Sequence, residues 1–255
     1  MSAEIILPIA FFSIALIYSS VGFGGGSSYL ALLALPVIGL LPDVIRPVGL
    51  LCNLVVAGGA SIIYYRKLRL SFGEWWPYVL PGIPLAFAGG WWKLSDDVFY
   101  LLLSGTLIVV SVLLWFQPAI HADKQEWLPA GKRLGAKAAV SASVGLLSGL
   151  VGIGGGIFLS PLMYFFRWSV PQRISAVASL YILLNSASGL LGQFSRGVPG
   201  LEWRFVWPLL LAVLAGGQIG SRLGSSRLSG LAIRRVTAVV ILAAALLVLR
   251  DHWPI

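Results

Sequence analysis

Ten apolar segments, separated by short polar or glycine-rich connections, cover most of the 255 residues. Five of them, at residues 5–21, 27–41, 44–65, 75–91 and 98–116, precede a polar loop at 117–137. Five more follow it, at residues 138–151, 157–166, 174–193, 205–221 and 236–249. Several are close to the roughly 20 apolar residues that a helix needs to cross a bilayer, whereas 27–41 and 157–166 are notably shorter. The pattern predicts an all-α integral membrane protein.

The second set of segments repeats landmarks of the first. The stretch VGFGGG at 21–26 is matched by VGIGGG at 151–156, and Trp-Pro and Ala-Gly-Gly pairs recur at similar offsets in the two halves. A duplication of this kind indicates an internal repeat. We therefore expect a first transmembrane repeat at 1–116, a cytoplasmic connecting loop at 117–137 and a second transmembrane repeat at 138–255.

Each glycine-rich motif interrupts an apolar run and is followed directly by a short segment. Three glycines in succession indicate a turn, because glycine lacks the Cβ that restricts the backbone and is a poor helix former. Inside a bilayer such a turn is tolerated only where protein, water or a ligand satisfies its backbone groups. We expect each pair of segments around a motif to form a re-entrant hairpin, although periodicity leaves two full crossings open. Each repeat then has a broken or re-entrant helix pair and three transmembrane helices.

Loop charges predict how the repeats are oriented. Arg66, Lys67 and Arg69 follow the third segment of the first half, whereas Arg222 and Arg235 lie in the connection after the fourth segment of the second half. Basic connections are typically cytoplasmic, so the two repeats are expected to have inverted topologies in a bacterial inner membrane, with both termini outside. The two glycine turns would then meet near the midplane, where inverted-repeat transporters bind their substrates.

Composition agrees with a membrane protein and excludes several other classes. The chain is 58% hydrophobic and 11% charged, with a mean hydropathy of +0.91. The net charge of +9 follows from the loops and gives no reason to expect nucleic acid. The single cysteine, Cys52, excludes an intrachain disulfide and a cysteine-based metal site.

The apolar segments also lack the residues that catalysis or proton relay would need. Both histidines, His121 and His252, lie outside the segments, and no Asp or Glu lies well inside one. An intramembrane proton relay, a metal site or a hydrolase is therefore poorly supported. Neither glycine motif continues into the Lys-Ser or Lys-Thr of a nucleotide-binding loop. We expect no enzyme activity and no cofactor.

The two glycine motifs, with Ser27 and Ser28 after the first and Leu159-Ser160-Pro161 after the second, carry a family resemblance. Together with the paired Ala-Gly-Gly stretches, they make the sequence similar to the sulfite exporter TauE/SafE family over nearly its whole length. The resemblance implies a membrane transporter of sulfite or small organosulfur anions, generally acting outward. The family is heterogeneous in substrate, so it implies the class of anion better than the particular one.

The main candidates for substrate binding are backbone groups of the two motifs. Exposed N–H groups at a glycine turn and at a helix N-terminus attract oxyanions. Close helix packing is the alternative, and for Gly89-Gly90 and Gly216-Gly217 it is the preferred interpretation. The candidates are Gly24, Gly25, Gly26 and Ser27 in the first half and Gly154, Gly155 and Gly156 in the second.

Four polar side chains are further candidates for contact with the anion. Asn53 and Asn185 lie at similar positions in the two halves, and each amide could donate to an anion or to a neighbouring helix. Gln218 is a weaker candidate. Arg46 has the planar donors that suit an oxyanion, but pairing with Asp43 or with water at the outer surface is the preferred interpretation, with a vestibule role as the alternative.

These observations predict a carrier that exports a small sulfur-containing anion, sulfite or an organosulfonate such as sulfoacetate, by alternating access. Two alternatives stay open: ion-coupled uptake of a sulfur oxyanion such as thiosulfate, and a membrane scaffold or sensor that transports nothing. The expected partners are a small anionic substrate and the lipid bilayer, with a homodimer left open.

Overall fold

The computed structural model describes residues 3–20, 24–35, 37–116, 130–197, 201–224 and 230–252. Within these ranges the chain forms eleven α-helices and no strand, so the predicted all-α class is confirmed. The helices are α1 (Ala3–Ser20), α2 (Gly26–Leu33), α3 (Pro42–Leu68), α4 (Phe72–Val79), α5 (Gly82–Trp91), α6 (Asp96–Trp115), α7 (Ala130–Val151), α8 (Gly156–Phe165), α9 (Pro171–Ser195), α10 (Trp203–Gly224) and α11 (Gly230–Asp251).

The helices fall into long and short classes. In the described part of the chain, five are long and apolar enough to cross a membrane: α3, α6, α7, α9 and α10. In contrast, α2 has 8 residues and α8 has 10. At 1.5 Å per residue they are about 12 and 15 Å long, half or less of a bilayer's hydrocarbon core. Neither short helix can cross a membrane alone.

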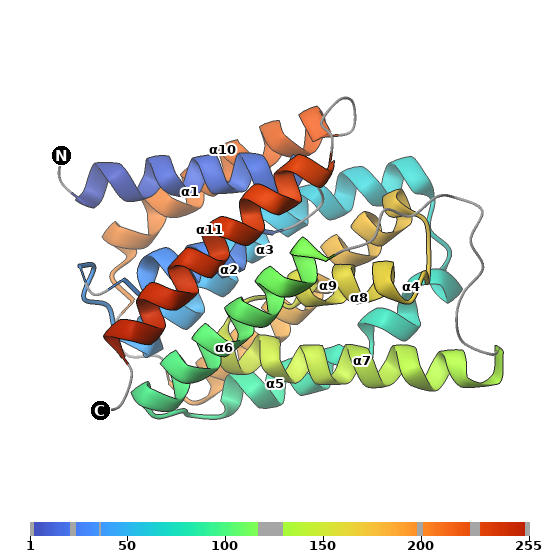
Figure 1. The fold of residues 1–255 in the computed structure, drawn as a ribbon, viewed down its shortest axis with the longest axis horizontal. Coiled ribbons are helices and arrows are strands. Elements are labelled where there is room, and N and C mark those ends of the chain that lie inside the picture. The colour runs from blue at the N-terminus through green and yellow to red at the C-terminus, as the bar shows by residue number, and fades with distance from the viewer. Residues whose placement is uncertain are drawn as a thin grey trace.

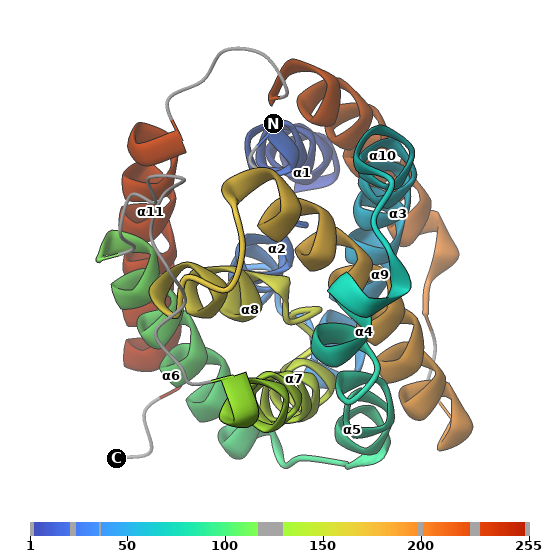
Figure 2. The same cartoon turned by 90° about the vertical axis from the view of Figure 1, so that its right-hand side faces the viewer.

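The packing pairs match between the two halves of the chain. Figures 1 and 2 show α1 lying along α10 and α5 along α7, while α3 packs on α9 and α6 on α11. In the two repeats, α1 corresponds to α7, α3 to α9, α5 to α10 and α6 to α11. Under this correspondence the α1–α10 pair matches the α7–α5 pair, and the α3–α9 and α6–α11 pairs each match themselves. The internal repeat seen in the sequence therefore has a counterpart in the order in which helices pack.

The chain reverses direction at both glycine motifs. Phe11 of α1 stacks on Tyr29 of α2 with ring centroids 4.7 Å apart, so α2 folds back beside α1. In the second half, Trp168 lies just beyond α8, and its ring centre is 6.0 Å from the ammonium of Lys137, near the start of α7. The pairs α1–α2 and α7–α8 are thus helical hairpins.

Two boundaries differ from the hydropathy prediction. The segment expected at 75–91 is two helices, α4 and α5, because Pro81 has no N–H with which to continue the hydrogen bonding. The predicted loop at 117–137 ends early, since α7 already begins at Ala130. Its first residues include Lys and Ala, which favour helix but do not extend an apolar run. Residues 117–129 lie outside the described residues.

The two ends of the molecule differ in charge. At the right-hand end in Figure 1, α3 and α10 end and α7, α9 and α11 begin, whereas the labels N and C both lie at the left-hand end. Described basic residues at or near these helix ends, called the basic end below, include Arg66, Lys67, Arg69, Lys137, Arg173, Arg222 and Arg235. The opposite helix ends carry a balanced set, with Asp43, Asp96, Asp97 and Glu202 beside Lys93, Arg196, Arg204 and Arg250.

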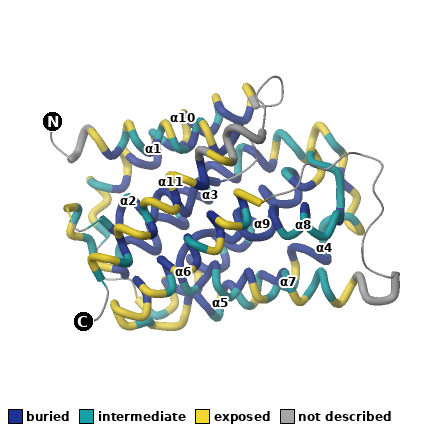
Figure 3. The backbone as a smooth tube through the Cα atoms, in the orientation of Figure 1, coloured by how far each residue is buried: buried dark blue, intermediate teal, exposed yellow. Residues whose placement is uncertain are grey.

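Buried residues face the inside of the bundle and exposed ones its periphery (Figure 3). Large apolar side chains, among them Leu101, Val109 and Leu211, are about half exposed on the outer faces of their helices. Exposed apolar surface on that scale is expected where lipid, rather than water, is the solvent.

Small residues let α5 approach α7 and α9 closely. A Cβ placed at Gly149 of α7 would lie 2.7 Å from the backbone nitrogen of Gly90 on α5, and one placed at Gly90 would lie 2.9 Å from the carbonyl carbon of Gly189 on α9. Likewise, a Cβ at Gly216 would lie 3.0 Å from the Cβ of Ala15. These distances support the packing interpretation of Gly89-Gly90 and Gly216-Gly217.

Gly149→Ala is expected to destabilise the bundle by about 1–3 kcal/mol, because the new methyl group forces two helix backbones apart. The thermal midpoint of the detergent-solubilised protein measures this effect. Gly105→Ala in α6 is the matched control, since a Cβ there would meet nothing within 4 Å. Equal midpoints for the two variants would contradict close packing at Gly149.

Candidate functional site

The glycine turns form the N-termini of the two short helices. Gly25 is the N-cap of α2 with φ 84°, and Gly155 is the N-cap of α8 with φ 77°. Both values are left-handed, a conformation that residues with a Cβ rarely adopt. Neither helix N-terminus has a side-chain hydrogen bond as a cap. Residues 21–23 of the first motif lie outside the described residues.

The two turns lie against each other, with the Asn53 side chain of α3 between them. Its Nδ2 donates to the Ile153 carbonyl in the second motif at 2.7 Å. A Cβ at Gly24 would lie 2.6 Å from Asn53 Oδ1, and one at Gly154 would lie 2.7 Å from Asn53 Nδ2. A Cβ at Gly26 would collide with both the Asn53 amide and the Ile153 carbonyl. The structure therefore brings Gly24, Gly26, Gly154 and Asn53 together.

Arg46 lies in the interior beside the second motif, not at the outer surface. It is 1% exposed, and its Nη2 donates to the carbonyl oxygens of Gly149 at 3.1 Å and Gly89 at 3.2 Å. A Cβ at Gly152 would lie 3.0 Å from the Cα of Arg46. The guanidinium therefore connects α3, α5 and α7 at the edge of the glycine turns.

The expected pairing of Arg46 with Asp43 is wrong. Asp43 pairs with Arg196 at 3.1 Å, because Asp43 lies in the first turn of α3, at the end of the bundle, while Arg46 turns inward. Within the described part of the chain, no carboxylate lies within ion-pair distance of Arg46. A buried guanidinium with no carboxylate in ion-pair contact is costly and strongly favours a nearby anion.

The remaining candidates are distributed differently. Asn185 donates to the Tyr181 carbonyl of its own helix at 3.0 Å, and a Cβ at Gly82 would lie 2.8 Å from its Oδ1, so it faces α5. Gln218 packs on Gly59, six residues beyond Asn53 and so about 9 Å along α3. Ser27 is buried in the first turn of α2. Of the four polar side-chain candidates, Asn53 and Arg46 contact a motif, and Gln218 lies apart.

Several buried polar atoms around the turns have no hydrogen-bond partner among the described residues. Buried polar groups are usually bonded, so this concentration is unusual for a packed interior. Asn53 Oδ1, Asn185 Oδ1 and the Arg46 Nε belong to it, as do the hydroxyls of Ser27, Tyr29, Ser148, Ser160 and Ser186.

Ser148 and Ser186 were missed by the sequence reasoning. A Cβ at Gly154 would lie 2.8 Å from Ser186 Oγ, and one at Gly155 would lie 3.1 Å from the Cβ of Ser148. Each is close in sequence to a singled-out feature, since Ser148 precedes the second motif and Ser186 follows Asn185. This closeness in sequence is the signal by which the two serines could have been identified as candidates.

The helix lengths, the lipid-like outer surface and the polar centre define a multi-pass α-helical membrane protein. The chain belongs to the sulfite exporter TauE/SafE family, whose model matches residues 6–248. It is also similar to the probable membrane transporter protein y4hK of Sinorhizobium fredii (strain NBRC 101917 / NGR234), with 34% identity over 244 residues, which are 94% of this chain and 96% of that protein. No solved structure matches it. The chain is therefore a membrane transporter.

Asn53→Ala is expected to lower the stability of the folded protein by about 1–3 kcal/mol, because it leaves the buried Ile153 carbonyl without its donor. A thermal melt in detergent measures the loss. Asn185→Ala is the matched comparison, because that amide donates within its own helix and its removal breaks no hydrogen bond between helices. If Asn185→Ala were the more damaging change, the bridging role of Asn53 would be refuted.

Proposed function

We propose that this transporter moves a small sulfur-containing anion, sulfite or an organosulfonate such as sulfoacetate, out of the cell by alternating access. The observation that carries the proposal is Arg46, a guanidinium buried beside the glycine turns and facing no carboxylate among the described residues. In a low-dielectric interior such a charge attracts an anion strongly, and its planar donors match an oxyanion.

The proposed architecture is a pair of inverted repeats, at 1–116 and 138–255. It is supported by the matched packing pairs and by the contact of the two hairpin tips through Asn53. The excess of basic residues at one end favours that end as cytoplasmic, with both termini on the outer side of the bacterial inner membrane. The turns would then lie near the midplane.

Separate roles follow for the groups at the turns. The N–H groups of the first turns of α2 and α8, without side-chain caps, would face the oxyanion, with Gly25, Gly26, Ser27, Gly155 and Gly156 supplying the backbone. The hydroxyls of Ser148 and Ser186 can add donors. One N–H of each amide, Asn53 and Asn185, donates to a carbonyl, so these asparagines position the turns and helices.

Export of an anion needs no coupling ion in a cell whose interior is negative. A monovalent anion leaving the cytoplasm gains roughly 2.3 kcal/mol per 100 mV, and a dianion gains twice as much. Membrane potential therefore suffices as the driving force.

Flux through proteoliposomes tests the proposed function. With sulfite, sulfoacetate or thiosulfate inside and an inside-negative potential, we expect efflux of at least one anion that scales with the potential. Flux that requires an added cation and runs inward would favour coupled uptake. Absence of flux for all three anions would contradict the substrate class and favour a scaffold.

Arg46→Met should reduce that flux by at least about thirtyfold, because it removes a buried charge that the bound anion would contact. Arg46→Lys keeps the charge but loses the planar donors, so an intermediate rate is expected. Arg66→Gln, at the exposed end of α3, is the control and should transport normally. Melting each variant in detergent separates loss of folding from loss of transport; a folded Arg46→Met protein with normal flux would refute the site.

Cysteine labelling tests the inverted arrangement independently. In a Cys52→Ser background, Lys67→Cys is expected to react with a membrane-impermeant maleimide only after the inner face is opened, because α3 ends at the basic end. Asp97→Cys, at the other end, should react from outside. The reverse labelling pattern would overturn the proposed orientation.

A further inference from the structure

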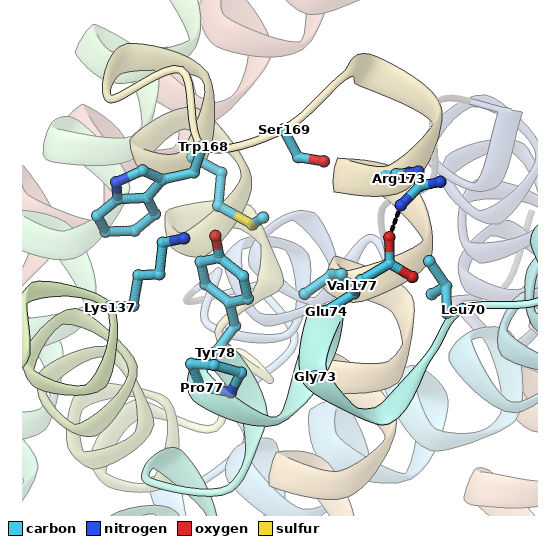
Figure 4. Close-up of a pocket in the computed structure, with 11 residues that line it drawn as sticks. Leu70, Gly73, Glu74, Pro77, Tyr78, Lys137, Trp168, Ser169, Arg173 and Val177 are labelled. Carbon is cyan, nitrogen blue, oxygen red and sulfur yellow. Dashed lines mark ion pairs between the residues drawn. The ribbon is translucent and has the colours of Figure 1, made fainter. Parts of the chain in front are cut away.

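A cavity of about 280 Å³ lies at the basic end, away from the glycine turns (Figure 4). It is lined by residues of α4, by Lys137 of α7, by the first two turns of α9, and by α8 with its connection to α9. Its lining residues are Leu70, Gly73, Glu74, Pro77, Tyr78, Lys137, Met163, Trp168, Ser169, Arg173 and Val177.

The lining carries two cations and one carboxylate. Arg173 of α9 forms an ion pair with Glu74 of α4 across the cavity (Figure 4). The ammonium of Lys137 lies 5.1 Å from the ring centre of Tyr78 and 6.0 Å from that of Trp168. An aromatic face stabilises a cation. The residues that line the cavity thus carry two cationic groups and one carboxylate.

The N-terminus of α9 adds to that charge. Its N-cap, Val170, offers no side-chain hydrogen bond, and Ser169 and Arg173 on either side of it line the cavity. The uncapped first turn of a 25-residue helix carries partial positive charge, which adds to the charge of the two cations.

Tyr181 lies one turn along α9 from a residue that lines this cavity, and it contacts a glycine turn. Arg173, Val177 and Tyr181 follow one another at four-residue spacing on one face of α9, and Lys137 and Ser141 do so on α7. The Tyr181 hydroxyl donates to the Ser141 carbonyl at 2.7 Å and so joins α9 to α7 one turn from the cavity lining. On its other side, a Cβ at Gly155 would lie 2.7 Å from the Tyr181 ring.

We propose that this cavity is the vestibule through which an oxyanion enters from the basic end, held by Lys137 and Arg173 in place of Glu74. The identity of that anion as the transported substrate rests on the proposed function. Arrival of the anion releases Glu74 from Arg173, and with it the contact that ties α4 to α9. Tyr181 is then the barrier between the vestibule and the glycine turns.

The opposite end of α9 has a related arrangement, which provides an internal comparison. There Arg196 pairs with Asp43 at 3.1 Å beside a cavity of about 490 Å³. That cavity is lined by Asp43, Trp91, Trp92, Lys93, Arg196 and Gly197. Helix α9 therefore has an arginine–carboxylate pair at each end, and variants at one end should act from one side only.

Glu74 can be altered without disturbing its local structural role. Its Oε2 accepts from the Ser71 backbone N–H at 2.8 Å in a capping box, while its Oε1 faces Arg173. Glutamine performs the same capping, so Glu74→Gln removes the competing charge and preserves the start of α4.

The vestibule is tested with sulfite as the probe, in oriented proteoliposomes and in detergent, with sodium chloride at equal ionic strength as the salt control. Arg173→Gln and Lys137→Gln are each expected to raise the sulfite concentration for half-maximal flux from the basic end by roughly five- to tenfold. Glu74→Gln should lower it, and Arg66→Gln should leave it unchanged. In all four variants, the sulfite concentration for half-maximal flux measured from the opposite end of the protein should not change.

A binding measurement separates this inference from the proposed function. Sulfite should raise the thermal midpoint of the solubilised full chain, and Arg173→Gln and Lys137→Gln should weaken that effect. Stabilisation with these properties but without flux would refute the transport proposal and support the vestibule. Normal flux and stabilisation in both variants, or equal effects from the two ends, would overturn the vestibule and leave the transport proposal intact.

Discussion

The hydrogen bond from Asn53 to the Ile153 carbonyl is the contact on which the centre of this structure depends. A glycine turn removes a carbonyl from helical hydrogen bonding, and in a bilayer an unsatisfied carbonyl costs several kcal/mol. Asn53 satisfies it from another helix at 2.7 Å. The bond is sterically possible because Gly24, Gly26 and Gly154 carry no side chains that would fill the space of the amide.

That arrangement leaves the centre polar but with few charges. Arg46 is the exception, and the carbonyls that accept from it belong to α5 and α7, two helices that small residues hold in close contact. Carbonyl dipoles orient a guanidinium without neutralising its charge. The same close packing that stabilises the bundle therefore fixes a cation beside the turns.

Features that depend on the local sequence could be predicted, and those that depend on distant partners could not. Apolar runs predicted an all-α protein, and repeated glycines predicted turns because each effect operates within a few residues. The burial of Arg46 could not be inferred, since Asp43 is three residues away while Gly89 and Gly149 are 43 and 103 residues away. Gln218 packs on Gly59 and not on a glycine motif, a contact that the local sequence does not indicate.

The two ion pairs of α9 suit the proposed mechanism, in which the two ends of that helix open in turn. Exposed pairs such as Arg173 with Glu74 contribute little net free energy, because water solvates both partners when they separate. An anion that replaces the carboxylate therefore makes the exchange nearly neutral, and a few kcal/mol from the membrane potential is enough to bias it. Arg46, buried and without a carboxylate partner among the described residues, can hold the anion more firmly than either end. Weak pairs at the ends and a buried charge at the centre are consistent with the alternating access that we propose.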